Sequence, residues 1–198
     1  MWLQISYYIR IQMRVIAGKF KGKPLFAPKG NRVRPTTDRI KETLFSMLYS
    51  KGYAESNAVL DLFSGSGALG IEALSRGAKA CTFVDCDKNS IALVKKNLDY
   101  AGTKQRVIHA DFKKALSLLE NQKHDIIFVD PPFNEKLEKS IIDNILKFNV
   151  LADDGIVVIE HDIKNDIPAL ITQFNGILSE TRECGSTALT FITKEKKD

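Results

Sequence analysis

The sequence predicts an α/β protein built on a mostly parallel sheet of seven strands, with helices on both faces. From residue 57 onward, short β-prone apolar runs alternate with segments of helical periodicity, which is typical of βαβ units. A glycine-rich turn leaves the first of these runs. Only three residues separate the last two β-prone runs, too few for a parallel crossover, so we expect an antiparallel hairpin at the sheet edge.

The boundaries of the elements follow from this alternation. The expected strands cover residues 58–62, 80–85, 106–110, 125–129 and 155–160, followed by the hairpin strands 176–183 and 187–193. The expected helices cover residues 68–76, 89–100, 112–119, 135–148 and 165–174.

A small basic segment precedes the sheet. Residues 14–18 and 23–26 flank a Gly/Lys turn, which favours a short β-hairpin. A helix should then open at residues 35–37, because Ile40, Leu44 and Leu48 recur with the spacing of one helical face. We therefore predict a hairpin and a helix as an N-terminal appendage to the sheet.

Composition narrows the class of protein. The chain has 198 residues, of which 44% are hydrophobic and 27% charged, as expected for one soluble globular domain. Its apolar runs are far shorter than the roughly 20 residues that span a bilayer, and residues 1–12 lack the apolar core of a signal peptide. We expect a cytoplasmic protein with no membrane association.

Cysteine and charge add two further expectations. Cys81, Cys86 and Cys184 form no CxxC pair, so the sequence indicates neither a disulfide framework nor a metal site. The net charge of +5 is unevenly distributed, because residues 1–50 contain ten Lys and Arg but only two acidic residues. The basic character belongs to the N-terminal quarter.

The glycine-rich turn indicates a nucleotide-like ligand. Gly65, Gly67 and Gly70 satisfy the GxGxxG pattern between an expected strand and an expected helix, which alone is a weak signal. Asp85 follows twenty residues after Gly65 at the end of the next expected strand, where a carboxylate can accept both ribose hydroxyls. An adenosine-containing cofactor fits this arrangement.

Acidic residues favour a cationic cofactor over a dinucleotide. Asp61 ends the first expected strand, where it would repel a pyrophosphate but attract an ammonium group. Asp111 ends the third and could bind an adenine amino group, with Phe112 bordering the ring. In a competing interpretation, the glycines only permit tight helix–strand packing and the aspartates only cap helices.

A rigid turn, Asp130-Pro131-Pro132-Phe133, follows the expected strand 125–129. The two prolines fix the backbone and remove two N–H donors, so the turn offers mainly acceptors. Acceptors that grip a planar amine orient its nitrogen toward an electrophile, and Phe133 supplies a stacking face. These residues do not distinguish guanine from adenine, and a simple Pro-rich turn is the competing interpretation.

From Met13 to its C-terminus, the chain resembles a bacterial family of class I S-adenosylmethionine-dependent methyltransferases. This family, the RsmD-like enzymes, methylates guanine N2 in 16S ribosomal RNA. The resemblance rests on the blocks RVIAG (14–18), RPTTDR (34–39) with ETLF (42–45), DLFSGSGALG (61–70) with EALSRGA (72–78), and VDPPF (129–133). The block at 34–45 is the most specific to the family.

The resemblance implies a Rossmann-like fold, S-adenosylmethionine as cofactor, and guanine-966 of the small-subunit RNA as target. The expected cofactor residues are Asp61, Phe63, Ser64, Gly65, Gly67, Asp85, Asp111 and Phe112. The expected catalytic residues at the target base are Asp130, Pro131, Pro132 and Phe133. One departure is Asp85, where the family more usually has Glu.

The resemblance also implies different roles for three segments of the chain. Residues 51–198 would form the methyltransferase domain, residues 13–50 would contact RNA, and residues 1–12 would be an extension upstream of a start at Met13. The expected RNA-binding residues are Lys19, Lys21, Lys23, Arg34 and Arg39, within a basic surface that also takes in Lys29, Arg32 and Lys41. We expect a metal-free monomer acting on 16S rRNA within a small-subunit particle.

Two alternatives remain open. The same fold could methylate adenine N6 in DNA or RNA, or a protein amide, because the turn after residue 129 suits any planar NH₂ group. A non-enzymatic nucleotide-binding or RNA-chaperone module would keep the basic segment without catalysis. The presence of both the glycine loop and the Asp-Pro-Pro-Phe turn argues against that module.

Overall fold

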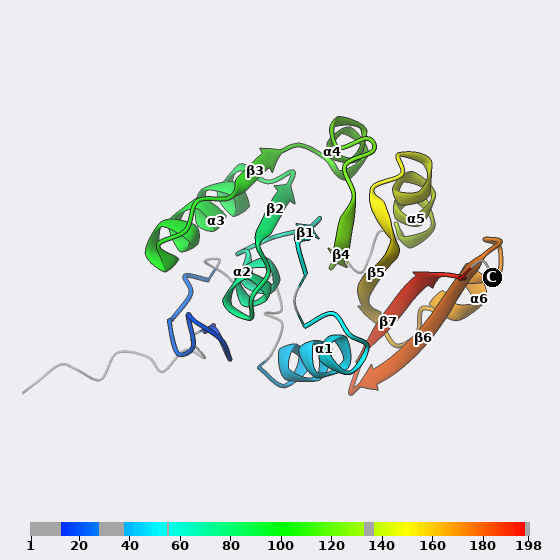
Figure 1. Ribbon diagram of the computed structural model, residues 1–198, viewed down its shortest axis with the longest axis horizontal. Helices are drawn as coiled ribbons and strands as arrows, with labels where there is room; N and C mark the ends of the chain where they lie inside the picture. The colour runs from blue at the N-terminus through cyan, green and yellow to red at the C-terminus, as the bar shows by residue number, and fades with distance from the viewer. Residues whose placement is uncertain (1–12, 28–37, 55, 133–136, 197–198) are drawn as a thin grey trace, which may run out of the picture.

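The computed structural model describes residues 13–27, 38–54, 56–132 and 137–196 (Figure 1). Its strands are β1 Ala58–Asp61, β2 Ala80–Asp85, β3 Arg106–His109, β4 His124–Val129, β5 Leu151–Asp162, β6 Ile177–Cys184 and β7 Thr187–Lys194. Its helices are α1 Asp38–Ser50, α2 Ala68–Ser75, α3 Lys88–Ala101, α4 Phe112–Leu118, α5 Glu138–Lys147 and α6 Ile167–Ile171.

The strands form one seven-stranded sheet in the order β3-β2-β1-β4-β5-β7-β6. Strands β1 to β5 pair in parallel, and β7 pairs antiparallel with both β5 and β6. The predicted fold is confirmed, including the antiparallel hairpin at the C-terminus. The strand order reverses between β1 and β4, and in such sheets ligands bind outside the carboxyl ends of the strands at that reversal.

Two apolar layers cover the sheet, one on each face. Helices α1, α2 and α3 pack on one face and α4, α5 and α6 on the other. In β4, Ile126 and Phe128 belong to the first layer and Ile127 and Val129 to the second. Every other side chain of a strand points to the same face, so a strand buried on both faces is apolar throughout.

Some boundaries differ from the sequence prediction. Helix α6 is shorter than the expected 165–174, because Gln173 N–H and Phe174 N–H bond carbonyls three residues back and so end the helix in tight turns. Strand β5 begins at Leu151 rather than 155, with a register shift against β4 between His124 and Ile126. The expected start of the fifth helix at 135 lies outside the described residues.

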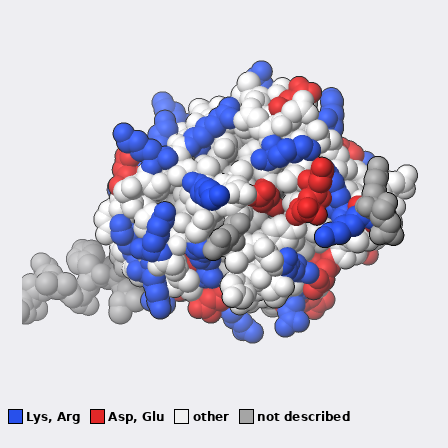
Figure 2. Space-filling view, viewed as in Figure 1, with Lys and Arg blue, Asp and Glu red and all other residues white. Residues whose placement is uncertain are grey.

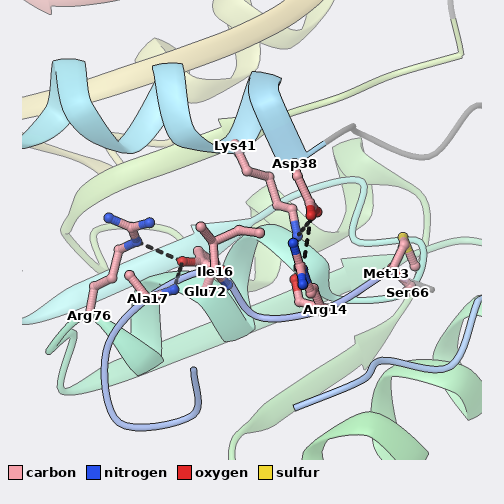
Figure 3. Close-up of polar contacts among 9 residues, drawn as sticks. All are labelled: Met13, Arg14, Ile16, Ala17, Asp38, Lys41, Ser66, Glu72 and Arg76. Atoms are coloured by element: carbon pink, nitrogen blue, oxygen red, sulfur yellow. Dashed lines mark hydrogen bonds and ion pairs between the residues drawn. The ribbon is translucent and has the colours of Figure 1, made fainter. Parts of the chain in front are cut away.

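Residues 13–27, which we call the arm, pack against α2 rather than standing apart from the sheet. The predicted pairing of 14–18 with 23–26 is present as an antiparallel bridge between Arg14 and Pro24. The N–H groups of Ile16 and Ala17 instead donate to the carboxylate of Glu72, at 2.7 and 3.0 Å (Figure 3). Glu72 is 0% exposed, so its charge is compensated within the protein by these donors.

Lys41 on α1 completes the docking of the arm. Its Nζ donates to the carbonyl oxygen of Arg14 at 2.5 Å and lies 3.7 Å from Asp38 Oδ1 (Figure 3). Burial lowers the pKa of Lys41, and the charges of Glu72 and Asp38 oppose that effect. The expectation that Lys41 belongs to a phosphate-binding surface is wrong, because the residue is 0% exposed and serves the internal packing of the arm.

Gly18 gives a direct test of arm docking. Its φ is +80°, and a Cβ there would lie 1.8 Å from the carbonyl oxygen of Ser75 on α2. Gly22 has nearly the same φ, +81°, but nothing lies within 4 Å of its would-be Cβ. We expect Gly22→Ala to lower the free energy of unfolding by about 1 kcal/mol, the cost of a left-handed alanine, and Gly18→Ala to lower it by at least about 2 kcal/mol more.

Urea unfolding of the two variants beside the parent protein measures this difference. Equal losses would contradict the packing of the arm against α2, because the backbone strain is matched and only the clash with Ser75 differs.

Candidate functional site

The glycine loop joins the carboxyl end of β1 to α2 and is left-handed at two positions. Gly65 has φ +52° and Gly67 has φ +78°, values that other residues rarely adopt. The N–H of Gly67 donates to the carbonyl of Ser64 at 2.6 Å, which closes the turn before α2 begins at Ala68. At Gly65 nothing lies within 4 Å of a would-be Cβ, so the backbone there is open to a ligand, whereas Gly67 is buried and its would-be Cβ would lie 3.2 Å from Cε1 of Phe83.

Gly70 has a different role from the other two glycines. A Cβ at Gly70 would lie 2.4 Å from Cε1 of Phe83 and 2.7 Å from Sγ of Cys81, both on β2. The absence of a side chain lets α2 pack directly on β2. For this position the packing interpretation is the correct one.

Two aspartates from neighbouring strands hold the loop. Asp61 at the end of β1 accepts a hydrogen bond from the N–H of Gly70 at 3.0 Å. Asp85 at the end of β2 accepts from the N–H of Gly65 at 2.8 Å through Oδ2, and from the N–H of Asp87 through Oδ1. The structure thus brings both predicted carboxylates to the loop, and Asp85 also fixes the backbone of Gly65.

The hydroxyl group of Ser64 indicates where a ligand could form a hydrogen bond. Its Oγ is buried, and within the described parts of the chain it has no hydrogen-bond partner. A buried hydroxyl without a partner costs about 1–3 kcal/mol. A polar ligand seated on the loop would remove that cost, so the residues present fit an adenosine-containing group with an amino-acid moiety.

Asp111 and Phe112 follow β3, and Phe63 follows β1. Asp111 Oδ1 accepts from the N–H groups of Lys113 and Lys114, so the residue is the N-cap of α4. The rings of Phe63 and Phe112 pack with centroids 5.7 Å apart. The capping role is observed, and the contact of Asp111 and Phe112 with an adenine ring stays a prediction.

Asp130 joins a cluster of carboxyl groups at the carboxyl ends of β1, β4 and β5. Burial raises its pKa well above the usual range, and the charges of Glu160 and then Asp61 raise it further. Burial also raises the pKa of Asp61 to about 7, while the hydrogen bond from Gly70 lowers it and the charge of Asp85 raises it. Such a cluster is electrostatically suited to a cation.

Glu160 is the member of this cluster that sequence reasoning missed. It follows Ile159, which pairs with Val129 of β4, and this register sets it beside Asp130. The signal was present as an acidic residue at the end of an apolar run in the expected strand 155–160. Only the register of β4 and β5 relates it to Asp130.

The structure describes two of the three residues that follow Asp130 in the predicted catalytic turn. Pro131 is buried and Pro132 is exposed, immediately after β4. Phe133 lies outside the described residues. The part of the turn that the structure describes thus lies at the same sheet edge as the glycine loop.

The predicted RNA-binding side chains lie on the outside of the molecule. Lys19, Lys21 and Arg39 are exposed, and Lys23 is half-buried with its Nζ donating to the carbonyl of Ala101 at 3.3 Å. Arg34 lies outside the described residues. In Figure 2, Lys and Arg side chains spread over the side of this face that carries the arm and α3.

Two kinds of feature are absent from the described residues. No helix there is long and apolar enough to cross a membrane. In the same residues, no group of three or more His, Cys, Asp or Glu side chains is arranged to hold a metal ion.

Comparison with known proteins places the chain in a family. The family model described as "Conserved hypothetical protein 95" matches residues 13–193. Ribosomal RNA small subunit methyltransferase D of Escherichia coli (strain K12) is 36% identical over 188 residues, covering 93% of this chain and 91% of that protein. The chain belongs to the RsmD family.

Other members and solved structures agree with this assignment. The Haemophilus influenzae protein of the same name is 37% identical over 178 residues, covering 88% of this chain and 90% of that one. The solved structure of Escherichia coli yhhF, provisionally named a methyltransferase, superposes with a TM-score of 0.80 at 31% identity, covering 94% and 99% of the two chains. The resemblance drawn from the sequence blocks to the RsmD family is confirmed.

The buried Asp61 gives a pH-dependent prediction. Its pKa is raised from 3.8 to about 7 on folding, so ionisation of Asp61 increasingly costs the folded state as pH rises through that interval. An asparagine side chain at this position would accept from the Gly70 N–H without ionising. We expect the free energy of unfolding of Asp61→Asn, relative to the parent protein, to rise by about 2 kcal/mol between about pH 5 and about pH 8.

Denaturant unfolding at several pH values measures this difference. Asp143→Asn, on the exposed side of α5, is the control and should show little change with pH. A stability difference for Asp61→Asn that is flat across the interval would contradict the raised pKa.

Proposed function

We propose that this RsmD-family protein transfers a methyl group from S-adenosylmethionine to the exocyclic N2 of a guanine in 16S ribosomal RNA, guanine-966 in the conventional numbering. The observation that carries the proposal is the position of the Asp130 turn, at the same sheet edge as the glycine loop and within one carboxyl cluster with Asp61. The names of the 36% and 37% identical relatives support the RNA substrate.

The residues of the loop would hold the cofactor, which supplies an electrophilic methyl group on a sulfonium. Asp61 and Asp85 offer carboxylates, and the buried Ser64 hydroxyl offers a hydrogen bond that it lacks among the described residues. Positive charge bound here would stabilise the ionised forms of the carboxyl cluster, opposing the rise in their pKa values.

Asp130 and the carbonyl of Pro131 would grip the target amine. The lone pair of a nucleobase amine is delocalised into the ring, so acceptors on its hydrogens favour the positive charge that develops on nitrogen. Positive charge bound at the cluster would keep Asp130 ionised, and the ionised carboxylate could also accept the proton that the amine loses. We assign Asp130 the roles of orienting the amine and taking its proton.

The basic residues of the arm and α1 would position the RNA. Lys19, Lys21, Lys23 and Arg39, together with Arg34, would contact phosphates, which supply affinity and orientation rather than sequence readout. In this proposal residues 13–50 contact RNA, residues 51–198 carry the methyltransferase site, and a small-subunit particle is the substrate.

A methyl-transfer assay tests the substrate and the atom together. Small ribosomal subunits lacking the modification are incubated with the protein and S-adenosylmethionine labelled in the methyl group, and the RNA is digested to nucleosides. We expect a single labelled N2-methylguanosine. Labelled N6-methyladenosine, or label in protein, would keep the fold and cofactor but contradict the proposed target.

Asp130→Ala tests the catalytic role within the same assay. We expect the rate of methyl transfer to fall by at least about 100-fold, because the variant loses both the hydrogen-bond acceptor that orients the amine and the group that takes its proton. Binding of RNA should change by less than about threefold, as measured by filter binding. Asp143→Asn is the control, and retained activity in Asp130→Ala would remove Asp130 from the mechanism.

A further inference from the structure

Lysine and aromatic side chains alternate along the seam between the arm and α3. Phe20 and Phe26 come from the arm and Tyr100 from α3. Lysines lie over these rings. We call the set the arm–α3 stripe; it consists of Lys19, Phe20, Lys23, Phe26, Lys96 and Tyr100.

The contacts make the stripe continuous. Lys19 Nζ lies 4.8 Å from the ring centroid of Phe20, and Lys23 Nζ lies 5.4 Å from Phe20 and 6.0 Å from Tyr100. The Tyr100 ring meets the Phe26 ring edge to face, with centroids 5.7 Å apart. Lys96 Nζ lies 3.6 Å from the Phe26 centroid.

Large apolar surface in the stripe remains in water. Tyr100 is 49% exposed and Phe26 is 39% exposed, although the core lies directly beneath α3. The position of Phe26 is nonetheless fixed by its backbone, because buried Asn97 accepts from its N–H at 2.8 Å and donates to its carbonyl at 3.1 Å. The ring is therefore held at the surface by a rigid main chain rather than left there by a loose one.

The same asparagine relates the stripe to the cofactor loop. Asn97 Nδ2 also donates to the carbonyl of Ser66, at 2.8 Å, within the glycine loop. The Phe26 end of the stripe is thus joined through one side chain to the loop that enters α2. Phe26 is therefore the part of the stripe that this hydrogen-bond chain connects to the glycine loop.

The chemistry of the stripe fits an unpaired nucleic acid strand. When the lysines that lie over the rings turn to pair with phosphates, the rings offer faces for bases of any sequence, and this combination is typical of single-strand binding surfaces. A duplex hides its bases and would use only the lysines. Lys19, Lys23 and Lys96 carry the positive charge that a phosphate backbone requires.

We propose that the arm–α3 stripe binds an unpaired segment of the RNA substrate, stacking bases on Tyr100 and Phe26 while its lysines contact the flanking phosphates. The inference rests on the proposed function for its substrate class. It adds two α3 residues, Lys96 and Tyr100, to the basic residues predicted from the sequence. It also adds base stacking on aromatic rings to the phosphate contacts.

Fluorescence anisotropy with two labelled RNAs tests the proposal. The probes are an unstructured single strand of about 12 nucleotides and a duplex of the same length, each titrated at several salt concentrations. Tyr100→Leu and Phe26→Leu remove the aromatic face and keep apolar bulk, and Lys96→Gln removes charge. Phe174→Leu is the matched control, because Lys139 Nζ likewise lies over the Phe174 ring, 5.3 Å from its centroid, and Phe174 packs on the face of the sheet opposite the arm.

We expect Tyr100→Leu and Phe26→Leu each to weaken single-strand binding about tenfold, the effect of losing a stacked base, with the salt slope unchanged. Lys96→Gln should reduce that slope by about 0.7, the value for one phosphate contact on a single strand. Duplex affinity should be unchanged in the two variants of the stripe, Tyr100→Leu and Phe26→Leu, and the control Phe174→Leu should behave as the parent. Tyr100 is half exposed, so its variant keeps the test valid if Phe26→Leu alters folding.

Two results would overturn the proposal. Unchanged single-strand affinity in Tyr100→Leu and Lys96→Gln would remove the stripe from RNA binding. Equal weakening of single strand and duplex in the leucine variants would show that the rings do not read unpaired bases. Failure of the proposed function would look different, since the parent protein would then leave small-subunit RNA unmethylated whatever the stripe variants do.

Discussion

The buried carboxylate of Glu72 is the interaction on which the arrangement of the functional parts depends. It lies on α2, the helix that leaves the glycine loop, and it accepts the N–H groups of Ile16 and Ala17 as well as Nε of Arg76. A buried charge is tolerated only when such donors compensate it. Compensation by the arm means that the basic segment and the cofactor helix are held as one body.

A second constraint acts at the carboxyl ends of the central strands, where like charges are brought together. Asp61, Asp130 and Glu160 come from three adjacent strands, and burial raises the pKa of both aspartates. The charge of Asp85 adds to the rise at Asp61, and the charges of Glu160 and Asp61 add to the rise at Asp130. Carboxyl groups arranged this way cost stability in the absence of a cation. That cost is typical of binding sites, which trade stability for complementarity to a charged ligand.

Local sequence patterns predicted most of the fold and much of the site. The seven strands, the C-terminal hairpin and the glycine loop followed from periodicity and turn residues, since these properties depend on neighbours in the chain. Prediction failed where the environment decided the outcome. Lys41 looked like a surface cation in a basic segment, but it is buried against the Arg14 carbonyl, and the first and last turns of α6 depend on bonds that periodicity does not reveal.

The sequence by itself determined the alternation of elements, the left-handed turn at Gly65 and Gly67, and the RsmD-like blocks, because each is written in contiguous residues. Only the tertiary structure decided that Glu160 lies beside Asp130 and that α3 joins the arm in one lysine–aromatic surface. Those relations depend on strand register and on the packing of distant segments. Both arise from burial of apolar faces across the whole sheet, and no local pattern encodes them.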